Sequence, residues 1–137
     1  MILLDWKQNV AFITVLASSY KNLSDTALIF TRIISNIGDG YNENTGIFCA
    51  PMAGTYVFNV NAYQHKNTKC VLNIVLNDES NNQAKGQFTN PEQTGTNMVL
   101  LILRKGDHVW VMQQHCYHSK DVEYSAVPLL TFSGFMI

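Results

Sequence analysis

The chain has 137 residues, of which 47% are hydrophobic and 14% charged, and its formal net charge is −1. This length suits one domain with an ordinary hydrophobic core, and the apolar content argues against disorder. The near-neutral charge offers no basic surface for nucleic acid, and no apolar run is long enough for membrane insertion.

Short apolar or alternating segments, separated by polar turns, predict strands along the whole chain. The clearest alternation places Tyr56, Phe58 and Val60 on one face of a strand and Thr55 and Asn59 on the other. With no long helical pattern, the chain is predicted to be all-β, a sandwich or a barrel. The predicted strands are residues 10–16, 28–34, 47–48, 55–63, 70–76, 84–89, 97–103, 107–113 and 129–137.

The connections between these strands are polar. Residues 36–40 and 42–46 are rich in Asn, Asp and Gly and predict turns. Asn22 begins an Asn-Leu-Ser triplet, a sequence that accepts N-linked glycans. Residues 114–128 are predicted to be a long loop whose middle can pair as a sheet edge.

Residues 98–103 are apolar on both faces of their predicted strand. One face of a sandwich sheet normally meets water. The surplus apolar face therefore indicates either a partner chain or a strand that lies deeper in the sandwich.

Cys49, Cys70 and Cys116 are an odd number of cysteines. One disulfide with a remaining thiol and three buried thiols are both open interpretations. No Cys-X-X-Cys spacing indicates a metal site. His115 and His118 would face opposite sides of a strand, which suits chelation poorly, so exposed loop histidines are the favoured interpretation.

A series of spaced aromatic, Asn and Gly residues resembles the pattern of the globular C1q-domain family, with Val60 in place of a final aromatic residue. Residues 103–111 and 131–137 look like the late and closing strands of that family, so the resemblance covers nearly the whole chain. The motif positions are Phe30, Asn36, Tyr41, Phe48, Gly54, Tyr56, Phe58, Phe132, Gly134 and Phe135.

The resemblance implies a ten-stranded jelly-roll β-sandwich that assembles as a homotrimer, with the surplus apolar face at the threefold axis. Residues 10–137 would form the single domain and residues 1–9 an N-terminal segment. The resemblance also implies a secreted, extracellular protein. Residues 1–4 are too short for a signal peptide, and no Gly-X-Y collagen repeat precedes the domain.

In complement C1q chains, the cysteine at the position of Cys70 pairs with a cysteine near residues 87–89. This chain has no cysteine there, which leaves Cys116 as the only new candidate partner.

If the late strands alternate in direction, residues 63–69, 89–97 and 114–128 connect them at one end of the domain. Rigid scaffolds often carry binding sites on such loops, although solvated loops without a ligand are the alternative. Aromatic faces pack against sugar rings, and Lys and His can donate hydrogen bonds to a carboxylate or sulfate. The candidate ligand-binding residues are Tyr63, His65, Lys66, Lys69, Gln93, Gln114, His115, Tyr117, His118 and Lys120.

No cofactor is required by this interpretation, but family trimers often hold calcium near this end. Asp121 and Glu123 are the local carboxylates, and Asp107 begins the strand that leads toward them. Calcium needs several oxygen ligands, so this supply is thin, and Lys120 disfavours a cation.

No catalytic constellation is evident in the sequence, which predicts a non-enzymatic protein. The resemblance implies that it is a secreted recognition protein. The resemblance implies lectin-like binding of sialylated or other acidic glycans, or of microbial patterns, in innate immunity. The alternative is a protein-ligand module that engages a receptor, as in cerebellin-like or adiponectin-like relatives. A third hypothesis makes the domain chiefly a trimerisation unit.

Overall fold

The computed structural model describes residues 9–16, 27–62, 68–77, 84–89, 96–118 and 130–137. These residues form strands and no helix, and none of them makes a helix long and apolar enough to cross a membrane. The strands are β1 (Ala11–Leu16), β2 (Arg32–Ile37), β3 (Phe48–Cys49), β4 (Gly54–Ala62), β5 (Thr68–Asn77), β6 (Ala84–Thr89), β7 (Thr96–Leu103), β8 (His108–His118) and β9 (Leu130–Met136).

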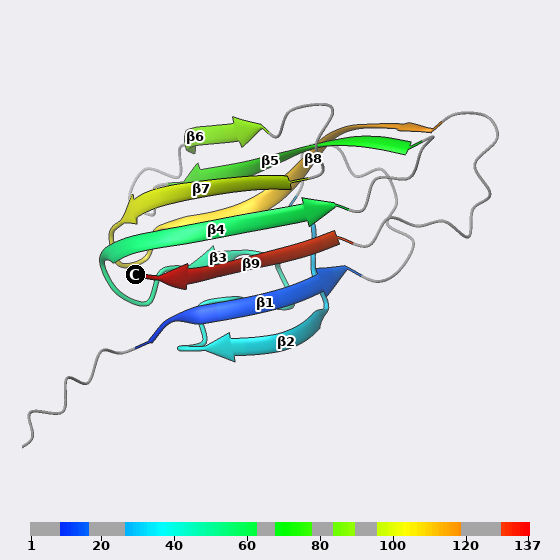
Figure 1. The fold of residues 1–137 in the computed structure, drawn as a ribbon. Helices are drawn as coiled ribbons and strands as arrows, with labels where there is room; N and C mark the ends of the chain where they lie inside the picture. Colours follow the sequence, from blue (N-terminus) through cyan, green and yellow to red (C-terminus); the bar gives the residue numbers. More distant parts are fainter. Residues whose placement is uncertain (1–8, 17–26, 63–67, 78–83, 90–95, 119–129) are drawn as a thin grey trace, which may run out of the picture.

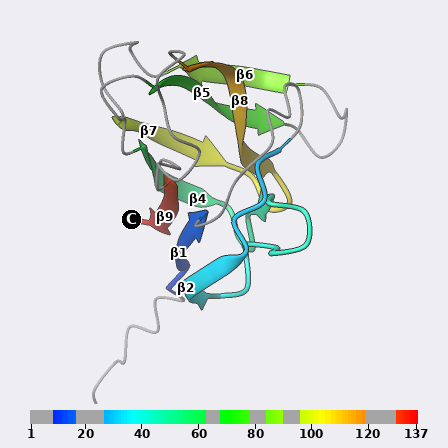
Figure 2. The same cartoon turned by 90° about the vertical axis from the view of Figure 1, so that its right-hand side faces the viewer.

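Two antiparallel sheets pack face to face (Figures 1 and 2). One sheet has the order β2-β1-β9-β4-β7 and the other the order β3-β8-β5-β6. First and last strands pair in the middle of the larger sheet, where β1 lies against β9. The prediction of an all-β jelly-roll sandwich is confirmed. The described residues account for nine of the ten expected strands, together with isolated bridges at Ala27 and Tyr41.

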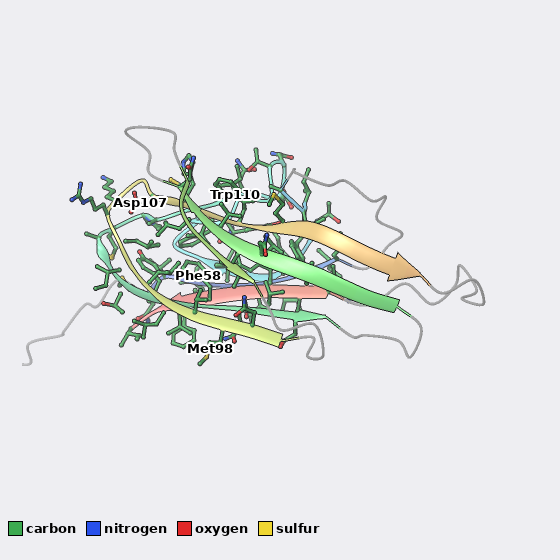
Figure 3. All side chains as sticks on the ribbon, turned by 90° about the horizontal axis from the view of Figure 1, so that it is seen from above. Phe58, Met98, Asp107 and Trp110 are labelled. Atoms are coloured by element: carbon green, nitrogen blue, oxygen red, sulfur yellow. The ribbon has the colours of Figure 1, made fainter. Side chains whose placement is uncertain are left out.

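The core between the sheets is aromatic. Tyr56, Phe58 and Val60 of β4 are at most 1% exposed, as their alternation predicts. Figure 3 shows Phe58 between the two layers. The Phe12 ring of β1 stacks on the Phe48 ring with centroids 5.0 Å apart, and the Phe132 ring meets Phe12 edge-on at 4.9 Å. Such ring pairs stabilise the core beyond the area that they bury.

Three motif residues form one hydrogen-bonded unit around the first turn. The Asn36 side-chain amide donates to the Tyr41 carbonyl at 2.8 Å, and the Tyr41 backbone N–H donates to Asn36 Oδ1 at 3.2 Å. The Tyr41 hydroxyl donates to the Phe30 carbonyl at 2.8 Å and accepts from the Phe30 N–H at 2.9 Å. The Tyr41 hydroxyl thus satisfies both the N–H and the carbonyl of the buried Phe30, so Phe30 needs no partner in a neighbouring strand.

This unit explains why the predicted strand at 28–34 is wrong in its position. The Leu28 N–H bonds to the Val111 carbonyl of β8, in the smaller sheet, whereas β2 begins at Arg32 in the larger sheet. Residues 27–31 therefore cross from one sheet to the other. Phe30 is held at the crossing by Tyr41 rather than by a ladder.

The predicted loop at 114–128 also needs correction. β8 continues to His118 because β5 begins already at Thr68 and pairs with it, Thr68 opposite His118 and Lys69 opposite Tyr117. Every one of these residues has a backbone donor and acceptor, whatever the polarity of its side chain. The ladder therefore extends through a polar segment whose composition is typical of a loop.

The Tyr41 hydroxyl gives the fold a measurable pH dependence. Burial raises the pKa of Tyr41 to about 12, whereas an unfolded tyrosine ionises near pH 10. Its stabilising contribution is therefore complete below about pH 10 and is lost as the pH rises toward about 12.

Tyr41→Phe should lower the free energy of unfolding by about 1–3 kcal/mol at pH 7, because the buried Phe30 N–H loses its acceptor. The variant should also lose less further stability than the wild type between pH 10 and pH 12. Urea unfolding at pH 7 and at pH 11 measures both effects. A variant as stable as the wild type at pH 7 would show that this hydroxyl does not hold the crossing.

Candidate functional site

Several strand ends meet at one end of the sandwich, which we call the loop end. Ala62, the last residue of β4, pairs with Leu130, the first of β9, and Leu130 also pairs with Leu16, the last of β1. β7 begins beside them, with Thr96 opposite Asn61. The predicted connections at 63–69, 89–97 and 114–128 thus leave strands that share this end, and the C-terminus lies at the other (Figure 1).

One further connection was missed by the sequence interpretation. Residues 17–26 also leave β1 at the loop end, because Leu16 is paired with Leu130 there. These residues contain the Asn22 triplet and lie outside the described part of the chain. This connection could not be predicted because its place depends on β1 lying next to β9, and only the sheet order shows that.

The predicted ligand-binding residues divide into two groups. Lys69 lies on β5, and Gln114, His115, Tyr117 and His118 lie on β8, so these are strand positions rather than loop positions. The others lie outside the described residues, namely Tyr63, His65, Lys66, Gln93 and Lys120.

The strand register brings part of the first group together. Lys69 is opposite Tyr117, and Val71 is opposite His115, so Lys69, His115 and Tyr117 share one sheet face. On β5 this is the face opposite to the core residues Leu72 and Ile74. We call these three residues the outer-face triad. His118, opposite Thr68, belongs to the other face.

The calcium prediction remains a prediction, because Asp121 and Glu123 lie outside the described residues. Asp107 directly precedes β8, the strand that runs toward residues 119–129, but it begins that course a full strand length away from them. Asp107 precedes β8 at the opposite end of the sandwich, where its Oδ2 accepts the Arg104 N–H at 2.9 Å (Figure 3). Within the part of the chain whose side chains are described, no group of three or more His, Cys, Asp or Glu residues can hold a metal ion.

A shallow depression of about 420 Å³ lies at the end of the sandwich opposite to the loop end. It is lined by the turn after β2, the segment before β4 and the turn before β8, including Asp39, Cys49 and Lys105. None of the predicted ligand-binding residues lines it.

The outer face of the larger sheet carries an apolar row across every strand. Leu100 of β7 pairs with Val57 of β4, which pairs with Phe135 of β9, which pairs with Ala11 of β1, which pairs with Ile37 of β2. We call these five residues the apolar row. Leu100, Phe135 and Ile37 are 60%, 47% and 52% exposed.

The apolar row continues along the edge strand β7. Met98 and Ile102 are 69% and 81% exposed, whereas Leu101 and Leu103 point into the core and are buried. Figure 3 shows Met98 on the outside of the sandwich, away from Phe58. The alternative that residues 98–103 lie deeper in the sandwich is therefore wrong for the single chain. The predicted second apolar face exists, and a monomer would expose it to water.

Comparison with known proteins agrees with this architecture. A family model described as the C1q domain matches residues 11–137. Human complement C1q tumor necrosis factor-related protein 3 is 28% identical over 131 residues, which cover 93% of this chain and 51% of that protein. The chain thus spans about half the length of this relative.

Two solved structures share the fold. The globular domain of zebrafish complement 1qA superposes with a TM-score of 0.68 at 20% identity, covering 94% of this chain and 97% of that one. Murine APRIL superposes with a TM-score of 0.58 at 9% identity, covering 94% and 99%.

Proposed function

Because the chain belongs to the C1q domain family, we propose that it is a secreted, non-enzymatic recognition protein that binds acidic glycans at the loop end of a homotrimer. Sialylated sugars and anionic microbial surface glycans are the ligands that this chemistry would suit. Calcium at Asp121 and Glu123 remains an optional element of the same proposal.

The observation that carries this proposal is the outer-face triad. It combines one lysine, one histidine and one tyrosine on neighbouring strands, within the last residues before the loop end. A lysine ammonium attracts a carboxylate or sulfate, an imidazole can donate a hydrogen bond, and a phenol ring packs against the apolar face of a sugar. Each interaction alone is weak, so a useful affinity needs several copies.

A trimer would supply those copies. Trimers are typical of the family, and the apolar row together with Met98 and Ile102 gives a surface that a threefold assembly would remove from water. Three sites on one rigid body raise the avidity for a repetitive surface by about 10²–10⁴ over one site.

Lys69→Ala and Tyr117→Ala should each weaken binding to an immobilised sialylated glycan by at least about tenfold, because each removes one part of the triad. The control is Lys105→Ala, which deletes an exposed lysine at the opposite end of the sandwich. Biolayer interferometry on trimeric fractions measures all three variants. Equal loss in the control, or no loss in the triad variants, would move the site away from the loop end.

A receptor-binding role is the second candidate. It is favoured by exposed apolar side chains outside the apolar row, with Ile29 41% and Ile34 60% exposed near the β2 side of the domain. Apolar side chains of this kind can pack into the apolar core of a protein interface. The two functions separate in one competition experiment, since free sugar displaces the protein from a cell surface only if glycans hold it there.

A further inference from the structure

The strand register sets two of the three cysteines directly opposite each other. Cys70 of β5 is the partner of Cys116 of β8 in the longest ladder of the smaller sheet. From this placement we propose that Cys70 and Cys116 form a cross-strand disulfide bond that closes the β5–β8 ladder at the loop end.

The backbone geometry suits this bond. Directly opposed residues of antiparallel strands have Cα atoms about 4.5–5.5 Å apart and lie on the same sheet face. Disulfides join residues whose Cα atoms are about 4.4–6.8 Å apart. The bond would therefore form without movement of either strand.

Cys49 is not a competing partner within one chain. It pairs with His108 at the other end of β8, eight residues from Cys116, which corresponds to about 27 Å along a strand. His108 is also opposite Asn77, so Cys49 is similarly far from Cys70. Of the pairings that the sequence left open, the register thus selects one.

The proposed bond lies next to an irregularity in the β5–β8 ladder, where it would stabilise the pairing. The ladder shifts register between Val71 and Leu72, so an irregularity separates the pairs that reach the loop end from the rest of β5 and β8. Such irregularities weaken pairing locally. A disulfide immediately beyond the shift would hold Lys69 against Tyr117 and fix the strand ends from which residues 63–67 and 119–129 depart.

Formation of the bond needs an oxidant, which we identify as a second disulfide, either oxidised glutathione or a disulfide-exchange catalyst of the secretory route. One cysteine thiolate attacks that disulfide, breaks its S–S bond and releases one thiol. The other cysteine then attacks the mixed disulfide and releases the second thiol. Both electrons and, in net, both cysteine protons pass to the oxidant, which ends as two thiols.

Peptide mapping tests the linkage directly. The protein as secreted is denatured with a chelator present and alkylated without reductant, so that thiols shielded only by folding or by a metal ion react. Trypsin then releases Cys70 in peptide 70–85, Cys116 in peptide 106–120 and Cys49 in peptide 33–66. We expect peptides 70–85 and 106–120 as one linked species that reductant separates. Alkylated Cys70 and Cys116, or a link from either to Cys49, would overturn the proposal.

Thermal unfolding tests the closing of the ladder. Reductant should lower the midpoint of the wild-type protein by about 10 °C, as expected for a disulfide that closes a loop of this length. The double variant Cys70→Ser/Cys116→Ser should have an unfolding midpoint close to that of the reduced wild type, and reductant should not change it. Cys49→Ser, the control, should keep the full reductant shift. A linked wild-type protein whose midpoint does not move would contradict the stabilising role, independently of any ligand.

Discussion

Ile102→Asp should convert the protein from a trimer into a folded monomer. Ile102 is 81% exposed in the single chain, so a polar side chain there costs the monomer almost nothing. In the proposed trimer the same position lies beside the apolar row, close to the axis. Three carboxylates would then be taken out of water without partners, a cost of several kcal/mol for each ion.

Multi-angle light scattering at micromolar concentration measures the result. The wild type should show about three times the chain mass of 15.4 kDa and the variant about one times that mass. The control is Ile29→Asp, which adds the same charge at an exposed isoleucine outside the apolar row and should remain trimeric. A monomeric wild type, or a trimeric Ile102→Asp variant, would contradict the proposed axis.

Gly134→Ala should prevent stable folding, or lower the free energy of unfolding by about 3 kcal/mol or more. A Cβ atom at Gly134 would lie 2.7 Å from Cδ1 of Phe58 and 2.8 Å from Cε1 of Phe12. Both rings are at most 1% exposed and are packed against Phe132 and Phe48. Neither ring can retreat without displacing its neighbours.

A second motif glycine provides the matched control. At Gly54 a Cβ atom would meet mainly the Met136 side chain, 3.1 Å from Sδ and 3.4 Å from Cγ. A methionine side chain is flexible and can move aside, so Gly54→Ala should change stability by less than about 1 kcal/mol. Chemical denaturation of the two variants distinguishes them. Similar stabilities would show that the contacts of Gly134 with the aromatic rings do not explain its place in the motif.

The sequence was informative wherever a residue has one structural role that its own strand dictates. The alternation around Tyr56 and Phe58 predicted the buried face of β4, and the apolar stretch at 98–103 predicted a second apolar face on β7. In both cases the period of the strand and the burial of apolar area act locally, so a local pattern records them.

It was less informative where a distant partner decides the structure. Phe30 was predicted to lie in a strand. Instead, its N–H and its carbonyl are both hydrogen-bonded to the Tyr41 hydroxyl, and the chain crosses from one sheet to the other there. His115 and Tyr117 looked like loop residues, but pairing with Val71 and Lys69 makes them part of β8. Neither partner can be identified from the composition of the segment itself.

The sequence predicted the end at which the connections meet, but not how the candidate residues are arranged on the strands there. The expectation that the late strands alternate in direction places their connections at one end of the domain. In the structure, the ends of β1, β4 and the start of β9 are paired at that end. Which residues share a face depends on the register shift between Val71 and Leu72, and no residue type marks that shift in the sequence. The outer-face triad could therefore be found only from the structure.

A glycan array probed with the trimeric wild-type protein, with and without a calcium chelator, tests the central proposal most directly. We expect selective binding to sialylated or sulfated glycans, weakened by added salt because the lysine contacts are exposed. Loss of signal in the chelator lane would assign calcium a part in the site, and an unchanged signal would assign binding to side chains alone. A folded trimer that binds none of the acidic glycans would contradict the lectin function and favour a protein receptor.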